Sequence, residues 1–217
     1  MLAAHNNAPL THTGRLEALS DGTFAIIITL LALEIHRPDA PAGHLREGLL
    51  HEWPSYLAYA VAFVNVGVIW LNHHYVFGQL ARTDLRLNWI NLAILGTATL
   101  IPFPTGVLAD AFGGRNPDDQ RAAVVLYALV ALLMSSAWIP LFLHLRHRQA
   151  DLTTAAEPGQ FTAEVLRPTI GSASYVLAAL LGWFVDPLAA VGLFVLIVAY
   201  YAVTSTGVRA YLRHTTD

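Results

Sequence analysis

One acidic residue interrupts an apolar stretch near the start of the chain. Asp21 lies inside the run 16–35, about 9 Å along a helix from Arg15. A carboxylate at that depth in a membrane costs a few kcal/mol, so it usually faces protein and has a partner. The candidate partners are Arg15, Ser20 and a histidine of another helix. We interpret the group as an interhelical polar network, with late capping of the helix by Ser20 and Asp21 as the alternative.

Histidines are the other residues whose type could support chemistry. His73 and His74 are adjacent, so on a helix they point about 100° apart and cannot readily share one metal ion. The i, i+4 spacing of helical zinc ligands is absent from this pair. His144 and His147 lie three residues apart near the end of a later apolar run. The spacing therefore predicts neither a metal site nor a catalytic site. A buried histidine could pair with Asp21; the alternative is that one histidine bonds across helices near the cytoplasmic end and the other meets lipid headgroups.

Branched apolar residues form a row on the helix that carries Asp21. Ile26, Leu30 and Leu33 are spaced i, i+4, i+7, and Thr29 lies beside them on the same face. We call these four residues the branched row. Such a face usually contacts lipid or packs in a core, and a helical threonine often bonds its own backbone. The spacing alone thus leaves packing and pore lining both open.

The elements that must position these residues are six apolar runs. A membrane-spanning helix needs about 20 such residues, and the continuous runs do not alternate as spanning strands do. We expect one six-helix membrane domain, with Pro102 and Pro104 bending or ending the third helix. The predicted helices are 16–35, 53–77, 85–109, 122–143, 168–185 and 188–208.

The composition supports an all-α integral membrane protein. Of the 217 residues, 55% are apolar and 12% are charged, about half the charged share of a soluble domain. A disordered chain would be poor in apolar residues. The absence of cysteine excludes disulfides and thiolate chemistry. A net charge of −3 implies no basic face for nucleic acid, and nothing in the sequence calls for a cofactor.

The arginines indicate the orientation in the membrane. All 12 Lys and Arg residues are arginine, and basic residues concentrate in cytoplasmic segments. If both termini are cytoplasmic, most arginines fall on the inner side, so we expect that orientation. The inner arginines would be Arg15, Arg82, Arg86, Arg146, Arg148, Arg167, Arg209 and Arg213.

Three tracts together resemble the transmembrane protein 175 family, potassium-permeable channels of endosomes and lysosomes with shorter bacterial homologues. Arg15, Leu19, Ser20 and Asp21 are similar to its Arg-x-x-x-Phe-Ser-Asp signature, with Leu19 in place of phenylalanine. The tract from Trp70 to His74 resembles part of the family's second helix, and Pro102-Phe-Pro-Thr105 resembles the end of its third.

The resemblance implies a bacterial plasma-membrane channel. A single six-helix repeat would assemble as a homotetramer in the bilayer, with the first helices lining a central pore and potassium as the permeant ion. The branched row of Ile26, Thr29, Leu30 and Leu33 would then form a weakly selective constriction. The polar network would comprise Arg15, Ser20, Asp21, Trp70, His73 and His74.

Two other classes of function remain open from the sequence. One is a small secondary transporter, proton-coupled through Asp21 and a histidine, although internal repeats and broken midplane helices typical of transporters are not evident. The other is a membrane enzyme that uses His73, His74, His144 and His147. The histidine spacing argues against that enzyme, so we expect a protein without catalytic activity.

Overall fold

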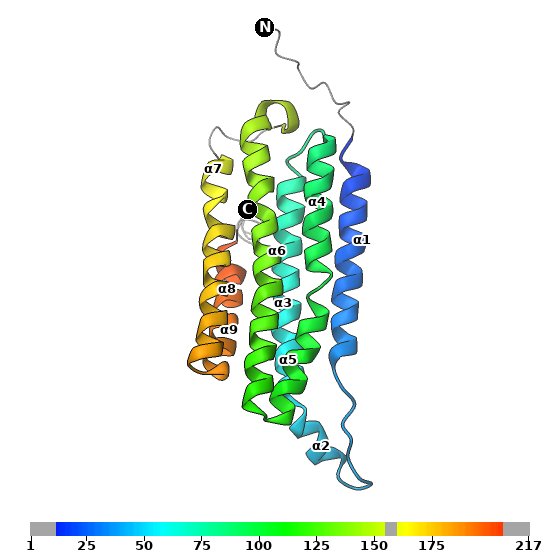
Figure 1. Cartoon of the computed structure of the whole chain (residues 1–217). Helices are drawn as coiled ribbons and strands as arrows, with labels where there is room; N and C mark the ends of the chain where they lie inside the picture. Colours follow the sequence, from blue (N-terminus) through cyan, green and yellow to red (C-terminus); the bar gives the residue numbers. More distant parts are fainter. Residues whose placement is uncertain (1–11, 155–159, 206–217) are drawn as a thin grey trace.

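The structure is a bundle of long helices, seen in Figure 1 in a computed structural model that describes residues 12–154 and 160–205. A bridge between extended residues pairs Leu80 with Thr153. The helices are α1 (Gly14–Leu31), η1 (Ala32–Glu34), α2 (Leu45–His51), α3 (Trp53–Phe77), α4 (Leu85–Ala98), α5 (Pro102–Gly114), α6 (Pro117–Leu152), α7 (Gln160–Glu164), α8 (Leu166–Phe184) and α9 (Pro187–Thr204).

Six segments are long and apolar enough to cross a bilayer, judged by length and composition. This confirms the expected all-α membrane class with six spanning helices. Positions 206–208 of the last predicted helix lie outside the described residues, as do Arg209 and Arg213. The six segments are Gly14–Glu34, Trp53–Phe77, Leu85–Gly114, Pro117–Leu152, Gln160–Phe184 and Pro187–Thr204.

The fourth spanning helix is much longer than the predicted 122–143. α6 has 36 residues, or about 54 Å at the usual rise, whereas the hydrocarbon core is about 30 Å thick. It begins early because the Asn116 side chain accepts hydrogen bonds from the backbone N–H groups of Asp118 and Asp119, and Pro117 occupies the first turn. Its other end continues through polar residues, with a kink at Arg148.

The third spanning segment is interrupted. α4 ends at Ala98 and α5 begins at Pro102, so the prolines break the helix as expected. Neither Pro102 nor Pro104 has an N–H group to donate to the preceding turn. Thr105 restores the helical pattern, because its backbone N–H and its hydroxyl both donate to the Ile101 carbonyl oxygen.

The arrangement places α1 at one edge of the bundle and α8 with α9 at the other (Figure 1). α6 contacts α4, α5, α8 and α9, while α1 contacts α3, α4 and α5. Two apolar cores result: one joins α1, α3, α4 and α6 around Phe24 and Ile94, and the other joins α5, α6, α8 and α9 around Val124 and Phe194. α1 is therefore covered by its own subunit on one side.

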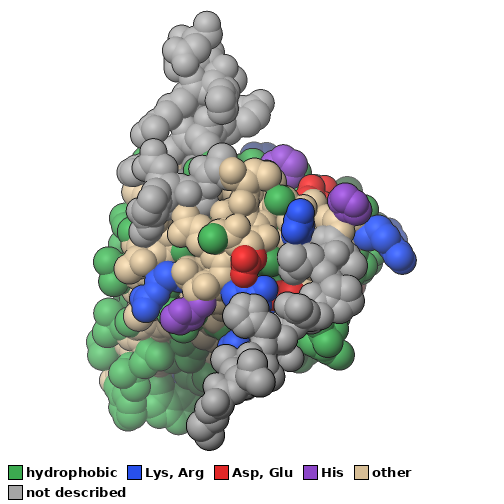
Figure 2. Space-filling model, turned by 90° about the horizontal axis from the view of Figure 1, so that it is seen from above, with side chains coloured by type: hydrophobic (Ala, Val, Ile, Leu, Met, Phe, Trp, Pro, Cys, Tyr) green, Lys and Arg blue, Asp and Glu red, His purple; other side chains and the backbone are tan. Residues whose placement is uncertain are grey.

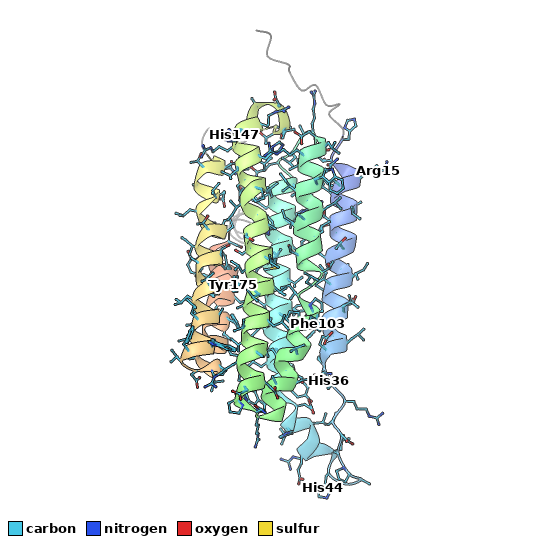
Figure 3. The ribbon with its side chains drawn as sticks, in the orientation of Figure 1. Arg15, His36, His44, Phe103, His147 and Tyr175 are labelled. Carbon is cyan, nitrogen blue, oxygen red and sulfur yellow. The ribbon has the colours of Figure 1, made fainter. Side chains whose placement is uncertain are left out.

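The two ends of the bundle differ from its flanks. Figure 2, viewed from the end where α1 begins, shows arginine and histidine side chains on that end and hydrophobic side chains along the visible flank. Figure 3 places Arg15 and His147 at this end and His44 at the opposite one. Polar ends with apolar sides are what a membrane-embedded bundle requires.

Candidate functional site: the first helix and its polar contacts

α1 has one buried face. Ser20, Phe24, Ile27 and Leu31 are its buried residues, at spacings of three and four residues that place them on one side of the helix. Phe24, Ile27 and Leu31 belong to the core that α1 shares with α3 and α4. This face attaches α1 to its own subunit.

The branched row lies on the opposite face. Ile26, Leu30 and Leu33 are 59%, 40% and 74% exposed in the single chain, and Thr29 is also exposed. The Thr29 hydroxyl donates to the Ile26 carbonyl oxygen at 2.8 Å, which fixes its direction. The described residues of the same subunit therefore leave a large part of these side chains exposed.

A hydrogen-bonded chain joins α1, α4 and α3 inside the bundle. The Asn91 amide nitrogen donates to the Ser20 hydroxyl at 3.0 Å, and His73 Nε2 donates to Asn91 Oδ1 at 2.8 Å. These three residues are almost completely buried. Since a buried amide or imidazole without partners is costly, each of the three side chains constrains the other two.

Asp21 bonds a tryptophan and not a histidine. Trp70 Nε1 donates to Asp21 Oδ1 at 2.9 Å, on the solvent- or lipid-accessible side of the α1–α3 contact. The His74 ring lies beside the Trp70 indole, with ring centroids 5.8 Å apart, and Arg15 takes no part in these hydrogen bonds. We call Ser20, Asp21, Trp70, His73 and Asn91 the polar cluster.

Aromatic rings enclose His73. Its ring stacks on Phe77 with centroids 3.9 Å apart and meets the Phe24 ring edge-on at 5.4 Å. His144, on α6, instead bonds the buried Asp84 carboxylate at 3.0 Å. Over the described residues, no three His, Cys, Asp or Glu side chains come together in a way that could hold a metal ion. The geometry thus favours structural roles for both histidines.

Comparison with known proteins relates this site to a channel family. The family described as "Endosomal/lysosomal potassium channel TMEM175" matches residues 15–102, which hold the branched row and the whole polar cluster. A potassium channel of Streptomyces collinus is 38% identical over 82% of this chain and 86% of its own length. The chain belongs to the TMEM175 family.

Further relatives agree with membership of the TMEM175 family. A potassium channel of Chamaesiphon minutus is 35% identical over 90% of this chain and 96% of its own length. The crystal structure of a lysosomal potassium-selective channel TMEM175 homolog from Chamaesiphon minutus has a TM-score of 0.77 at 34% identity, covering 89% of this chain and 98% of that chain.

Sequence reasoning missed two members of the polar contacts in this TMEM175-family chain. Asn91 had no assigned role, and Asp84 was not considered as the partner of His144. The available signal was an amide in an apolar spanning segment, since such groups usually bond across helices. For Asp84 the signal was an acidic residue directly before a helix, the usual position of a capping side chain.

Proposed function

We propose that this protein is a subunit of a potassium-permeable, weakly selective cation channel in a bacterial plasma membrane, with both termini cytoplasmic. Membership of the TMEM175 family and the potassium-channel names of two relatives that it matches nearly end to end support the activity. The observation that carries the pore assignment is the exposure of the branched row along α1 and η1. The proposal requires no cofactor, metal or catalytic residue.

The constriction requires several copies of α1. One helix cannot enclose an axis, whereas the exposed faces of four α1 helices in a homotetramer can surround one. Rings of Ile26, Leu30 and Leu33 would narrow the path and close it by steric contact and dewetting. Potassium loses hydration water more easily than sodium, so an apolar neck favours potassium modestly. The Thr29 hydroxyl oxygen would offer a polar contact within that neck.

The polar cluster would hold the pore helix in place. Ser20 and Asp21 lie one to two turns before Ile26, and their partners come from α3 and α4. Hydrogen bonds between membrane helices contribute roughly 0.6–2 kcal/mol each. The cluster would therefore fix the rotation of α1 that turns the branched row away from its own subunit.

Ion flux into liposomes tests the proposal. Purified protein is reconstituted, and potassium, sodium and an impermeant cation are compared in wild type and Ile26→Ala. We expect flux that favours potassium, with greater leak and lower selectivity in the variant. Leu196→Ala is the matched control, because Leu196 is a similarly exposed apolar residue on α9; it should behave as wild type.

Three results would contradict the proposal. Absence of cation flux at every gradient and voltage would remove the channel activity. Flux that saturates with substrate far below channel rates would indicate a secondary transporter. Identical currents in Ile26→Ala and wild type would remove the branched row from the pore. Native mass spectrometry tests the assembly separately, with four subunits as the expected mass.

A further inference from the structure

The Glu34 side chain approaches α5 closely at Gly106. Glu34 ends η1, and its carboxylate lies directly against the backbone of Gly106. A Cβ at position 106 would lie 3.0 Å from the Glu34 carboxyl carbon and still closer to its Oε2 oxygen. Real Cβ atoms do not tolerate such contacts, so any side chain at position 106 would displace the carboxylate. We call this contact the Glu34 seat.

The Glu34 seat lies at the opposite end of the first spanning segment from the polar cluster. Ser20 and Asp21 are bound near the start of α1, whereas η1 contacts α3 and α5 at its end. Figure 1 shows α5 beside this end of α1. The branched row lies between the two attachments, and Leu33, its most exposed member, directly precedes Glu34.

Among the described residues, a second contact joins the end of this segment to α5: His36 Nδ1 and Asp110 Oδ1 lie 3.4 Å apart on exposed side chains. α1 ends at Leu31, a short 3₁₀ turn follows, and the chain is extended from Ile35. A 3₁₀ turn has weaker hydrogen-bond geometry than an α-helix and commonly marks a place that can move. The position of Leu33 therefore depends on what holds this turn.

We propose that Glu34 is a positioning residue, which seats on Gly106 to fix the outer end of the pore helix and so sets how closely the Leu33 side chains approach the ion path. The inference rests on the proposed channel function for its effect on ions. The geometric part, that the seat places Leu33, does not depend on it. The competing role is purely electrostatic: a carboxylate near the pore mouth would attract cations wherever its side chain points.

Matched variants distinguish the effect of the position of the Glu34 side chain from the effect of its charge. Glu34→Gln removes the charge but keeps the length and shape that fill the seat. Gly106→Ala keeps the charge but displaces the side chain. Glu34→Ala combined with Gly106→Ala fills the vacated space with a methyl group. Gly113→Ala is the control on the same helix, because a Cβ there would meet nothing within 4 Å.

Two measurements are made on each variant in the full-length protein in liposomes. The first is the potassium-to-sodium permeability ratio. The second is the rate at which a thiol reagent modifies Leu33→Cys, the single thiol in a chain without cysteine. We expect Gly106→Ala to change both several-fold, Glu34→Gln and Gly113→Ala to match wild type, and the double variant to lie closer to wild type than Gly106→Ala alone.

The outcomes decide the proposal. Unchanged ratio and unchanged thiol rate in Gly106→Ala overturn it. A Glu34→Gln ratio that shifts as far as that of Glu34→Ala overturns it in favour of the electrostatic role. If wild type conducts no cations, the channel proposal fails, while the thiol rates still support or overturn the seat. A Gly106→Ala variant that does not fold is replaced by the double variant against Glu34→Ala, where any recovery by the added methyl supports the seat.

Discussion

The side-chain amide of Asn91 donates to the hydroxyl of Ser20 across 3.0 Å, although the residues are 71 positions apart in the chain. The same hydroxyl donates to the Leu16 carbonyl oxygen at 2.8 Å, and both side chains are fully buried. The rotation of α1 about its axis is thus coupled to α4 through a bond that water cannot replace.

Asn91→Ala is expected to destabilise the subunit by about 1–3 kcal/mol, because it leaves the buried Ser20 hydroxyl and the His73 imidazole without their partner. Thermal unfolding in detergent measures the loss. Asn88→Ala is the matched control on the same helix, since Asn88 Oδ1 has no hydrogen-bond partner among the described residues. Equal losses in the two variants would argue against the buried chain of hydrogen bonds.

The Trp70–Asp21 contact can be tested as a pair. Trp70→Phe removes the donor, and Asp21→Asn keeps an acceptor oxygen but loses the charge. We expect each single change to lower stability by about 1 kcal/mol, as for an accessible hydrogen bond, and the double variant to lose less than the sum. We also expect Asp21→Asn to weaken assembly on native gels. Strictly additive losses would show that the two side chains act independently.

The buried Asp84–His144 pair should contribute more to stability than the accessible Trp70–Asp21 hydrogen bond. Asp84 accepts from His144 Nε2 and also from the backbone N–H of Leu87, so it caps α4 and joins it to α6. Removing one partner of a buried pair typically costs about 3–5 kcal/mol, and we expect a loss of this order for His144→Ala in denaturant unfolding. His147→Ala, three residues on and exposed, should change little. Comparable losses of stability in His144→Ala and His147→Ala would show that the Asp84–His144 pair is not the source of the stabilisation.

Close packing of α8 gives a further prediction. A Cβ at Gly182 would collide with Val124 Cγ1 of α6 and approach Ala190 of α9 to 3.2 Å. Gly182→Ala should therefore cost about 1–3 kcal/mol through overpacking. Gly192→Ala should be neutral or slightly stabilising, because a Cβ there would meet nothing within 4 Å and alanine favours helix. Melting temperatures of the two variants check this contrast.

The features that the sequence could predict are those that depend on local composition and spacing. Continuous apolar runs indicate spanning helices, and Pro102 and Pro104 disfavour continuation of a helix. The six segments and the break in the third could therefore be predicted. Helical spacing likewise predicted that Ile26, Leu30 and Leu33 share one exposed face, which the structure divides between α1 and η1. Whether that face meets a neighbouring subunit depends on contacts between chains, and it stays a prediction.

Other features depend on geometry between distant segments. The sequence alone left Arg15, Ser20 and a histidine as candidate partners of Asp21, and the resemblance placed Trp70 in the same network. The packing of α3 against α1 brings Trp70 to Asp21 and turns His73 inward to Asn91. The ends of α6 were misplaced, because its capping by Asn116 and its polar last turns leave no hydropathy signal. The side-chain pairing follows from tertiary structure, whereas the capping by Asn116 is a local signal that an apolar pattern does not carry.

Because α4 and α5 are separate helices, the first spanning segment is held by two different elements. α4 carries Asn91, which bonds Ser20, and α5 carries Gly106, which the Glu34 side chain contacts. An unbroken helix would transmit any tilt along its whole length. Because residues 99–101 separate α4 from α5, the two ends of the first spanning segment are held by different helices, and a tilt of one of these helices need not be transmitted to the other.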